Sequence, residues 1–301
     1  MVTTNNAEFD GQRAKLYEQA LREYPQARAN DIKAMKRLLN PSSGEKILGA
    51  GEGNGLFYLD IANSVIPNGA YCVVDPSKDQ LNSLLGRITK DEIQKLLNRV
   101  KLEQELGYYP QEEKNKELQA KRLRLNFVLN RQVAGIESMK VFEGQFDKVW
   151  SFGAFHHCPN QTEGMKRIYQ SLKPGGLAVI CDVFQGSSLA KYFDHETAKY
   201  SLTGHEVKFL SEDFAKSLCY LAGFEEKKVS INDLPQKWVF DSERDVGKFI
   251  YLLHGLTGIP GNEEEKYLRT LESCKNILGV SKNSSDKYEL NWPMKVLKAI
   301  K

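Results

Sequence analysis

The run ILGAGEGNG, residues 47–55, decides the fold class of this 301-residue chain. Residues 45–48 have the composition of a short strand, and the spacing of apolar residues over 56–65 predicts a helix directly after the run. Glycines at alternate positions between them let the backbone turn tightly and let a ligand approach without meeting a β-carbon. The run therefore predicts a strand, a ligand-binding glycine loop and a helix, as at the start of an open α/β sheet.

A second strand follows the helix, after the turn at residues 67–69. Residues 70–74 are apolar and rich in valine, as expected of a buried parallel strand, and Asp75 ends them. A carboxylate at that position can accept both hydroxyl groups of an adenosine ribose. The dinucleotide fingerprint would need glycine at position 54 or 56, where Asn54 and Leu56 stand, so a nicotinamide or flavin cofactor is disfavoured.

Helices and strands then alternate along the chain. The pattern predicts two helices within residues 14–39, ahead of the first strand, and a helical insertion over about 91–121. Two more helices are expected within residues 238–283. The remaining strands are predicted at 125–129, 146–152, 177–184, 226–231 and 288–300. We expect a doubly wound α/β fold with a mostly parallel, seven-stranded sheet.

Composition narrows the class of protein. Lys and Arg number 42 against 39 Asp and Glu, a formal charge of +3, and the basic residues are spread along the chain. Nucleic acid is therefore not required as a partner. The five widely spaced cysteines form no C-x-x-C pair, and nothing in the sequence indicates a metal. No segment approaches the roughly 20 apolar residues that span a bilayer, so we expect a soluble, cytoplasmic protein with reduced thiols and no membrane partner.

Four segments together resemble the successive motifs of a known family. They are the glycine run at 47–53, VVDPS at 73–77, FDKVWSFGAFHH at 146–157 and LKPGG at 172–176. In this order and spacing they are similar to the class I S-adenosylmethionine-dependent methyltransferases, and the likeness covers about residues 17–184. The resemblance implies a Rossmann-like methyltransferase fold, S-adenosylmethionine as the cofactor and methyl transfer as the activity.

The resemblance also assigns roles to residues of this chain. The loop glycines would pass under the methionine part of the cofactor, and the acid that ends the second strand would hold its ribose. An amide in the loop after the third strand would reach the adenine amine. The implied cofactor-binding residues are Gly49, Ala50, Gly51, Gly53, Asp75, Pro76, Gln132, Ser151, Phe152 and Gly153.

One position departs from the family's pattern. The family usually carries an acid two residues before the first glycine of the loop, where it helps to bind the cofactor's ammonium group. With Gly49 as the first glycine, that position holds Ile47. Glu52, another side chain or water would have to replace the acid. The departure keeps open a protein that binds S-adenosylmethionine without transferring its methyl group.

Candidate residues on the acceptor side are less constrained by the sequence. His157 is the candidate catalytic base, because imidazole titrates near neutral pH, although it can equally be a structural residue. The candidate substrate-binding residues are Tyr17 and Tyr24 in the N-terminal helices, and His195 and His205 after the fifth strand. Each of these four can instead serve packing or lie at a polar surface.

The expected organisation is a helical lid over residues 1–40 and a methyltransferase domain over 41–301, with helical insertions at about 91–121 and 238–283. The second insertion would cap an acceptor pocket or form a homodimer contact. This layout favours a small-molecule acceptor, methylated at oxygen, nitrogen or carbon. The basic run at 121–124 keeps methylation of RNA or protein as an alternative.

Overall fold

The computed structural model describes residues 6–65, 69–87, 131–141 and 143–301. The strand expected at 125–129, the insertion expected at about 91–121 and the basic run at 121–124 lie outside these residues. Within the described ranges, helices and strands alternate over most of the chain, as the sequence predicts.

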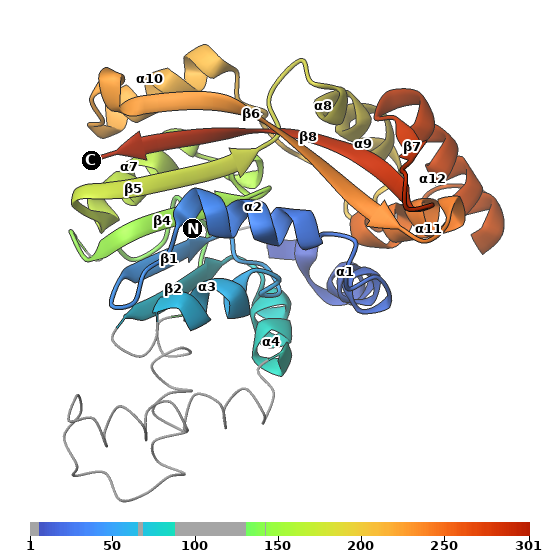
Figure 1. Cartoon of the computed structure of the whole chain (residues 1–301), viewed down its shortest axis with the longest axis horizontal. Helices are drawn as coiled ribbons and strands as arrows, with labels where there is room; N and C mark the ends of the chain where they lie inside the picture. Colours follow the sequence, from blue (N-terminus) through green and yellow to red (C-terminus); the bar gives the residue numbers. More distant parts are fainter. Residues whose placement is uncertain (1–5, 66–68, 88–130, 142) are drawn as a thin grey trace, which may run out of the picture.

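One sheet organises the molecule (Figure 1). Its strand order is β3-β2-β1-β4-β5-β8-β6, and β7 pairs with β8. β1 is parallel to β2 and β4, whereas β8 is antiparallel to β5 and β6. The strands are β1 (Lys46–Ala50), β2 (Ala70–Asp75), β3 (Arg131–Val133), β4 (Phe146–Phe152), β5 (Leu172–Asp182), β6 (Val229–Phe240), β7 (Val280–Lys282) and β8 (Tyr288–Ile300). The predicted doubly wound, mostly parallel sheet is confirmed, and the short β7 adds an eighth strand.

The structure describes ten α-helices and four short helical turns within these residues. They are α1 (Gly11–Glu23), α2 (Ala29–Leu39), α3 (Tyr58–Val65), α4 (Lys78–Arg87), α7 (Gln161–Ser171), α8 (Ser188–Tyr192), α9 (Ala198–Tyr200), α10 (Glu212–Ala222), α11 (Glu243–His254) and α12 (Glu263–Ile277). Short turns of helix form η1 (Asn6–Phe9), η2 (Phe155–His157), η3 (Phe193–Thr197) and η4 (Glu226–Lys228). Serine or asparagine side chains cap α7, α10, α11 and α12, which satisfies backbone N–H groups of their first turns. In the described part of the chain, no helix is long and apolar enough to span a membrane.

Both faces of the central strands β1 and β2 are buried. Ile47 and Val73 belong to the core cluster that includes residues of α2 and α3, whereas Leu48 and Val74 belong to the cluster that includes residues of α7 and α10. Successive side chains of a strand point to opposite faces, so a strand covered on both faces needs apolar residues throughout. This requirement accounts for the continuous apolar runs that allowed β1 and β2 to be predicted.

Two long strands, β6 and β8, extend beyond the rest of the sheet toward the C-terminal helices. β6 was expected to end near residue 231, but it continues to Phe240 and pairs with β8 along its whole length. Its second half alternates buried and exposed side chains, with Leu234, Trp238 and Phe240 buried, so it remains a strand with one covered face. Figure 1 shows β6 and β8 extending beyond β5 to the group formed by α8, α9, α11 and α12. We call α11 and α12 the cap.

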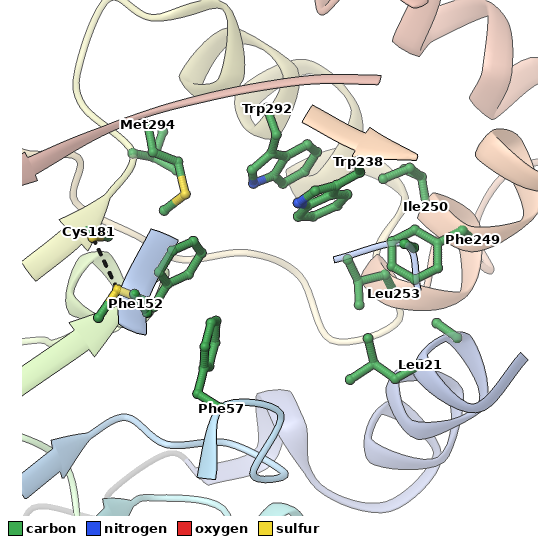
Figure 2. Close-up of a cluster of buried hydrophobic side chains, with 14 of the residues drawn as sticks. Leu21, Phe57, Phe152, Cys181, Trp238, Phe249, Ile250, Leu253, Trp292 and Met294 are labelled. Carbon is green, nitrogen blue, oxygen red and sulfur yellow. Dashed lines mark hydrogen bonds between the residues drawn. The ribbon is translucent and has the colours of Figure 1, made fainter. Parts of the chain in front are cut away.

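An aromatic core joins the cap to the sheet. The indole rings of Trp238 on β6 and Trp292 on β8 stack with their centroids 3.9 Å apart. Phe249 of α11 packs edge-on against Trp238, with centroids 5.5 Å apart. Figure 2 shows this group beside Leu21, a residue of the N-terminal helix α1. The cap and the N-terminal helices therefore share one core with the sheet.

Candidate active site

The glycine loop begins two residues later than the sequence predicts. β1 continues through Gly49 and Ala50, and Gly49 pairs with both neighbouring strands. The loop itself contains Gly51, Gly53 and Gly55, whose φ angles are +78°, +63° and +79°. These angles lie in the left-handed region, where side chains are costly. The alternate-glycine turn that a ligand can approach is therefore formed by residues 51, 53 and 55.

This boundary moves the family's acid position from Ile47 to Gly49, two residues before Gly51. The carboxylate of Glu52 occupies the space in which a side chain at position 49 would lie. Glu52 is buried, and its Oε2 accepts a hydrogen bond of 2.7 Å from the hydroxyl of Tyr71. Its Oε1 is buried without a hydrogen-bond partner. Burial raises the pKa of Glu52 to about 8, although the Tyr71 bond opposes the shift.

Asp75 fixes the loop at the end of β2. Its Oδ2 accepts a hydrogen bond of 2.8 Å from the backbone N–H of Gly53, and its Oδ1 accepts one of 2.9 Å from that of Ser77. Burial raises the pKa of Asp75 to about 6, while the two N–H groups act in the opposite direction. Each carboxylate oxygen keeps a further lone pair, so Asp75 can also accept ribose hydroxyls. Pro76 lies half-buried between Asp75 and Ser77.

The end of β4 lies against the same loop. A β-carbon on Gly51 would overlap that of Ala154, and the buried Ser151 has an Oγ without a hydrogen-bond partner. Phe152 packs on Phe57, with ring centroids 5.0 Å apart. Gly153 turns the chain with a φ of +62°. The structure thus brings the predicted residues 151–153 to the glycine loop.

Gln132 does not lie where the sequence predicted it. It is a residue of β3 paired with Val74, not a residue of the following loop. Its amide bonds the backbone of Lys140: Nε2 donates to the carbonyl over 3.2 Å, and Oε1 accepts from the N–H over 2.6 Å. Because both ends of the amide are already used, Gln132 stabilises the turn after β3 in this structure.

The N-terminal segment, η1 and α1, lies over the carboxyl ends of these strands. The hydroxyl of Ser77 lies 2.6 Å from Oδ1 of Asp10, and the amide of Asn54 donates to Glu18 over 2.6 Å. Arg87 of α4 forms an ion pair of 2.8 Å with the same Glu18. The segment is thereby tied to the glycine loop and to β2.

The two candidate tyrosines contact other protein groups. The hydroxyl of Tyr17 accepts a hydrogen bond of 3.1 Å from the buried Arg28. The hydroxyl of Tyr24 donates one of 3.0 Å to Asp245 of α11. Tyr24 also packs edge-on against Phe249. The structure therefore places Tyr24 in the contact between α1 and the cap.

Histidines gather beside the lid, at the ends of β4 and β5. His156 and His157 form η2, and His205 belongs to the loop between α9 and α10. One ring nitrogen from each lies within 4.8 Å of those of the other two. Asp182, the last residue of β5, binds His156 twice: it accepts from the backbone N–H over 3.0 Å and lies 2.5 Å from Nδ1. Burial is the main cause that lowers the pKa values of His157 and His205, so both are neutral near pH 7.

The remaining candidate, His195, lies elsewhere. It belongs to η3 and lines a surface hollow with Gln185, Lys191 and Phe209. The structure therefore joins His205 to His157 but does not join His195 to them.

Two residues that the sequence did not single out also lie near these histidines. Arg13 of α1 is buried, and its Nε and Nη1 have no hydrogen-bond partner. Its guanidinium lies 4.9 Å from the ring centroid of Phe9, and burial lowers its pKa to about 10. The carboxylate of Glu8 lies 3.1 Å from Nδ1 of His157. A charged residue on a short amphipathic helix is usually exposed, so no sequence signal marked Arg13.

Residues 47–178 match a family model described as a methyltransferase domain. The match spans the glycine loop, Asp75, the end of β4 and the histidines of η2. This match is consistent with the class I S-adenosylmethionine-dependent methyltransferases, whose motifs the sequence resembles. A search of curated proteins finds no match to this methyltransferase.

Solved structures share the fold of this methyltransferase at low sequence identity. A phosphoethanolamine N-methyltransferase 2 from Haemonchus contortus, in complex with S-adenosylmethionine, is 15% identical with a TM-score of 0.59; the match covers 99% of this chain and 59% of that one. The YcgJ protein from Bacillus subtilis is 15% identical with a TM-score of 0.55, over 91% and 98% of the two chains. A possible histamine N-methyltransferase from Thermotoga maritima is 14% identical with a TM-score of 0.52, over 96% of each chain.

The cofactor-side residues of the methyltransferase fit S-adenosylmethionine. Three loop glycines allow the left-handed backbone of the turn, and Asp75 offers a carboxylate at the end of β2. Glu52, in the loop, and Ser151, near Gly51, each have a buried oxygen without a hydrogen-bond partner. Such oxygens are costly unless a ligand or water bonds them. A hydroxyl oxygen and a carboxyl oxygen can each accept a hydrogen bond from the ammonium or hydroxyl groups of this cofactor.

Proposed function

We propose that this methyltransferase transfers the methyl group of S-adenosylmethionine to a small-molecule acceptor at oxygen, nitrogen or carbon, and releases S-adenosylhomocysteine. The observation that carries the proposal is the enclosure of the acceptor side. η1 and α1 lie over the carboxyl ends of β2 and β4, and the cap packs against α1. An RNA or a folded protein would have to displace these contacts, whereas a small molecule would not.

The chain's own residues supply orientation and exclusion of water. The bound cofactor provides an electrophilic methyl group on a sulfonium, so the acceptor needs a lone pair directed at that carbon. Glu52 and Asp75 would fix the two ends of the cofactor, and the aromatic core around Trp238 and Trp292 would exclude water from the acceptor side. His157 is neutral near pH 7, so it can accept a proton from an acceptor hydroxyl or ammonium.

Structures with a similar fold are consistent with a small acceptor. The Haemonchus contortus enzyme is described as acting on phosphoethanolamine and the Thermotoga maritima protein as a possible histamine N-methyltransferase. A [4+2]-cyclase, SpnF, has the same fold with a TM-score of 0.50 and 14% identity. The fold therefore does not fix the reaction, and cofactor binding without methyl transfer is the second candidate.

The test is a methyl-transfer assay with labelled S-adenosylmethionine against small amines, hydroxy compounds and carboxylates, with bulk RNA and protein as further acceptors. We expect label in one class of small molecule and stoichiometric S-adenosylhomocysteine. Label in RNA or protein alone would overturn the small-molecule proposal. Tight cofactor binding without turnover of any acceptor would favour the second candidate.

A further inference from the structure

Three histidines in this protein converge on one point. His156 and His157 are adjacent in η2, and His205 reaches them from a loop 48 residues further along the chain. Their ring nitrogens lie within 4.8 Å of one another, one from each residue. The rings of His156 and His157 are 4.1 Å apart and those of His157 and His205 are 5.1 Å apart, measured between centroids. We call these residues the histidine cluster.

Carboxylates lie beside the Nδ1 atoms of two members of the cluster. Asp182 lies 2.5 Å from Nδ1 of His156, and Glu8 lies 3.1 Å from Nδ1 of His157. A histidine that binds a metal through one nitrogen usually has its other nitrogen against a carboxylate or a carbonyl, which fixes the tautomer and turns the ring. With each Nδ1 facing its carboxylate, Nε2 is the nitrogen left for a ligand in both rings.

We propose that the histidine cluster binds a divalent first-row transition metal ion such as Zn²⁺, with His156, His157 and His205 as its protein ligands. Three imidazole nitrogens suit this class of ion, whereas Mg²⁺ and Ca²⁺ prefer oxygen ligands. Bonds of about 2.1 Å in a tetrahedral site would bring the nitrogens to about 3.4 Å from one another, so binding draws the three rings together. Three protein ligands leave a fourth position open.

The charges near the cluster are compatible with the ion. Asp182 and Glu8 carry two negative charges against Nδ1 atoms of the cluster, which offsets a divalent ion. Arg13 lies near the same histidines, and its positive charge is one cause of the lowered pKa of His205. Its buried Nε and Nη1 have no partner in the protein. An anionic group that occupied the fourth position would also satisfy Arg13.

The effect of the ion on the reaction depends on the proposed function, whereas binding of the ion does not. A hydroxyl or carboxylate oxygen in the fourth position would be polarised by the ion. The ion would lower the pKa of that hydroxyl, whose proton would pass to solvent, and the resulting oxyanion would be a better nucleophile toward a methyl group. With the ion bound, His157 is a ligand, and the ion replaces it as the group that activates the acceptor. The ion would thus select oxygen acceptors that can reach the cluster.

The test uses the full chain without an affinity tag, stripped with a chelator and then titrated with Zn²⁺ by calorimetry and with Co²⁺ by visible absorption. We expect one ion per chain, the intense absorption of tetrahedral Co²⁺, and no response to Mg²⁺. His205→Ala and His157→Ala should each weaken binding at least tenfold. His195→Ala, the same change outside the cluster, should leave binding of the ion unchanged.

Three results would overturn the metal site. One is the absence of the Co²⁺ bands in the wild-type chain. Another is equal binding by the His195→Ala and His205→Ala variants. The third is Arg13-dependent binding of phosphate or acetate by a chain that binds no metal, which would make the cluster an anion site. Separate titration with S-adenosylhomocysteine distinguishes these results from failure of the proposed function, because cofactor binding does not use the cluster.

Discussion

The carboxylate of Glu52 fills the space in which a side chain on Gly49 would lie. Gly49 is the strand residue at which relatives usually carry an acid, and Glu52 comes from the loop three residues later. Tyr71 holds Oε2 of Glu52 at 2.7 Å and is itself held by Nε1 of Trp150 at 3.0 Å. The acid thus reaches its place from a different position in the sequence, and glycine at 49 is the residue that leaves room for it.

We expect Glu52→Gln to weaken binding of S-adenosylhomocysteine at least tenfold and to leave binding of methylthioadenosine nearly unchanged. Methylthioadenosine lacks the ammonium group, so only the first ligand would lose a charge-assisted hydrogen bond. Calorimetric titration of both ligands measures the difference. The double variant Gly49→Asp with Glu52→Ala should recover part of the lost affinity. Equal loss for the two ligands would show that Glu52 acts on the loop rather than on the ammonium group.

Stability should depend on pH through Glu52. Its pKa rises from an ordinary 4.5 to about 8, so between these values the folded state binds more protons than the unfolded state, and this carboxyl makes folding less favourable as pH rises. Tyr71 and Asp75 are the titratable groups that face it. Relative to wild type, Glu52→Gln should gain stability from pH 5 to pH 8, by about 4 kcal/mol at most. Urea unfolding at both values tests this, and a constant difference would contradict the burial of an uncompensated carboxyl.

Gly51→Ala should abolish cofactor binding. The substitution meets the β-carbon of Ala154 and forces an alanine to a φ of +78°. Gly175→Ala is the matched control, because Gly175 has the same φ but nothing within 4 Å of the added atom. Both variants lose about 1–2 kcal/mol from the left-handed conformation, measurable by urea unfolding. Only Gly51→Ala should lose binding of S-adenosylhomocysteine, and similar affinities in the two variants would refute a close approach at the loop.

Removal of Arg28 should destabilise the protein strongly. Its Nε lies 2.8 Å from Oδ2 of the fully buried Asp31, which also accepts from Nε1 of Trp238 over 2.9 Å. Arg28→Ala would leave that carboxylate without its charge partner, at a cost of about 3–5 kcal/mol in the free energy of unfolding. Arg244→Ala breaks an exposed pair with Glu264 and should change little. If urea unfolding gave the two variants similar losses in the free energy of unfolding, burial would not determine how much each ion pair contributes to stability.

Much of the fold follows from local pattern in the sequence. The buried strands are continuous apolar runs, and β8 was predicted with the same bounds that it has in the structure. The end of β1 was misplaced because glycine carries no side chain with which to mark a strand, and the pairing of Gly49 with two neighbours appears only when the sheet is assembled. The extension of β6 was missed for a different reason. Its second half alternates buried and exposed side chains, so it contains no continuous apolar run.

The site was less accessible to prediction than the fold. Asp75 and residues 151–153 lie at the carboxyl ends of strands, and these ends meet at one edge of a parallel sheet, so their convergence was foreseeable. His205 and Arg13 lie on a loop and on a helix whose spacing carries no sign of their partners. The three-dimensional packing of the lid decides which of the five histidines meet.

The contact between α1 and α11 has a consequence for the order in which the protein matures. Tyr24 and Asp245 are joined across 221 residues, so α1 can pack on the glycine loop early but cannot contact α11 until most of the chain has left the ribosome. The nascent chain can complete the glycine loop and β2 long before that, because those contacts are local. The contact between α1 and the cap is therefore among the last to form, and a truncated translation product would retain the cofactor loop without it.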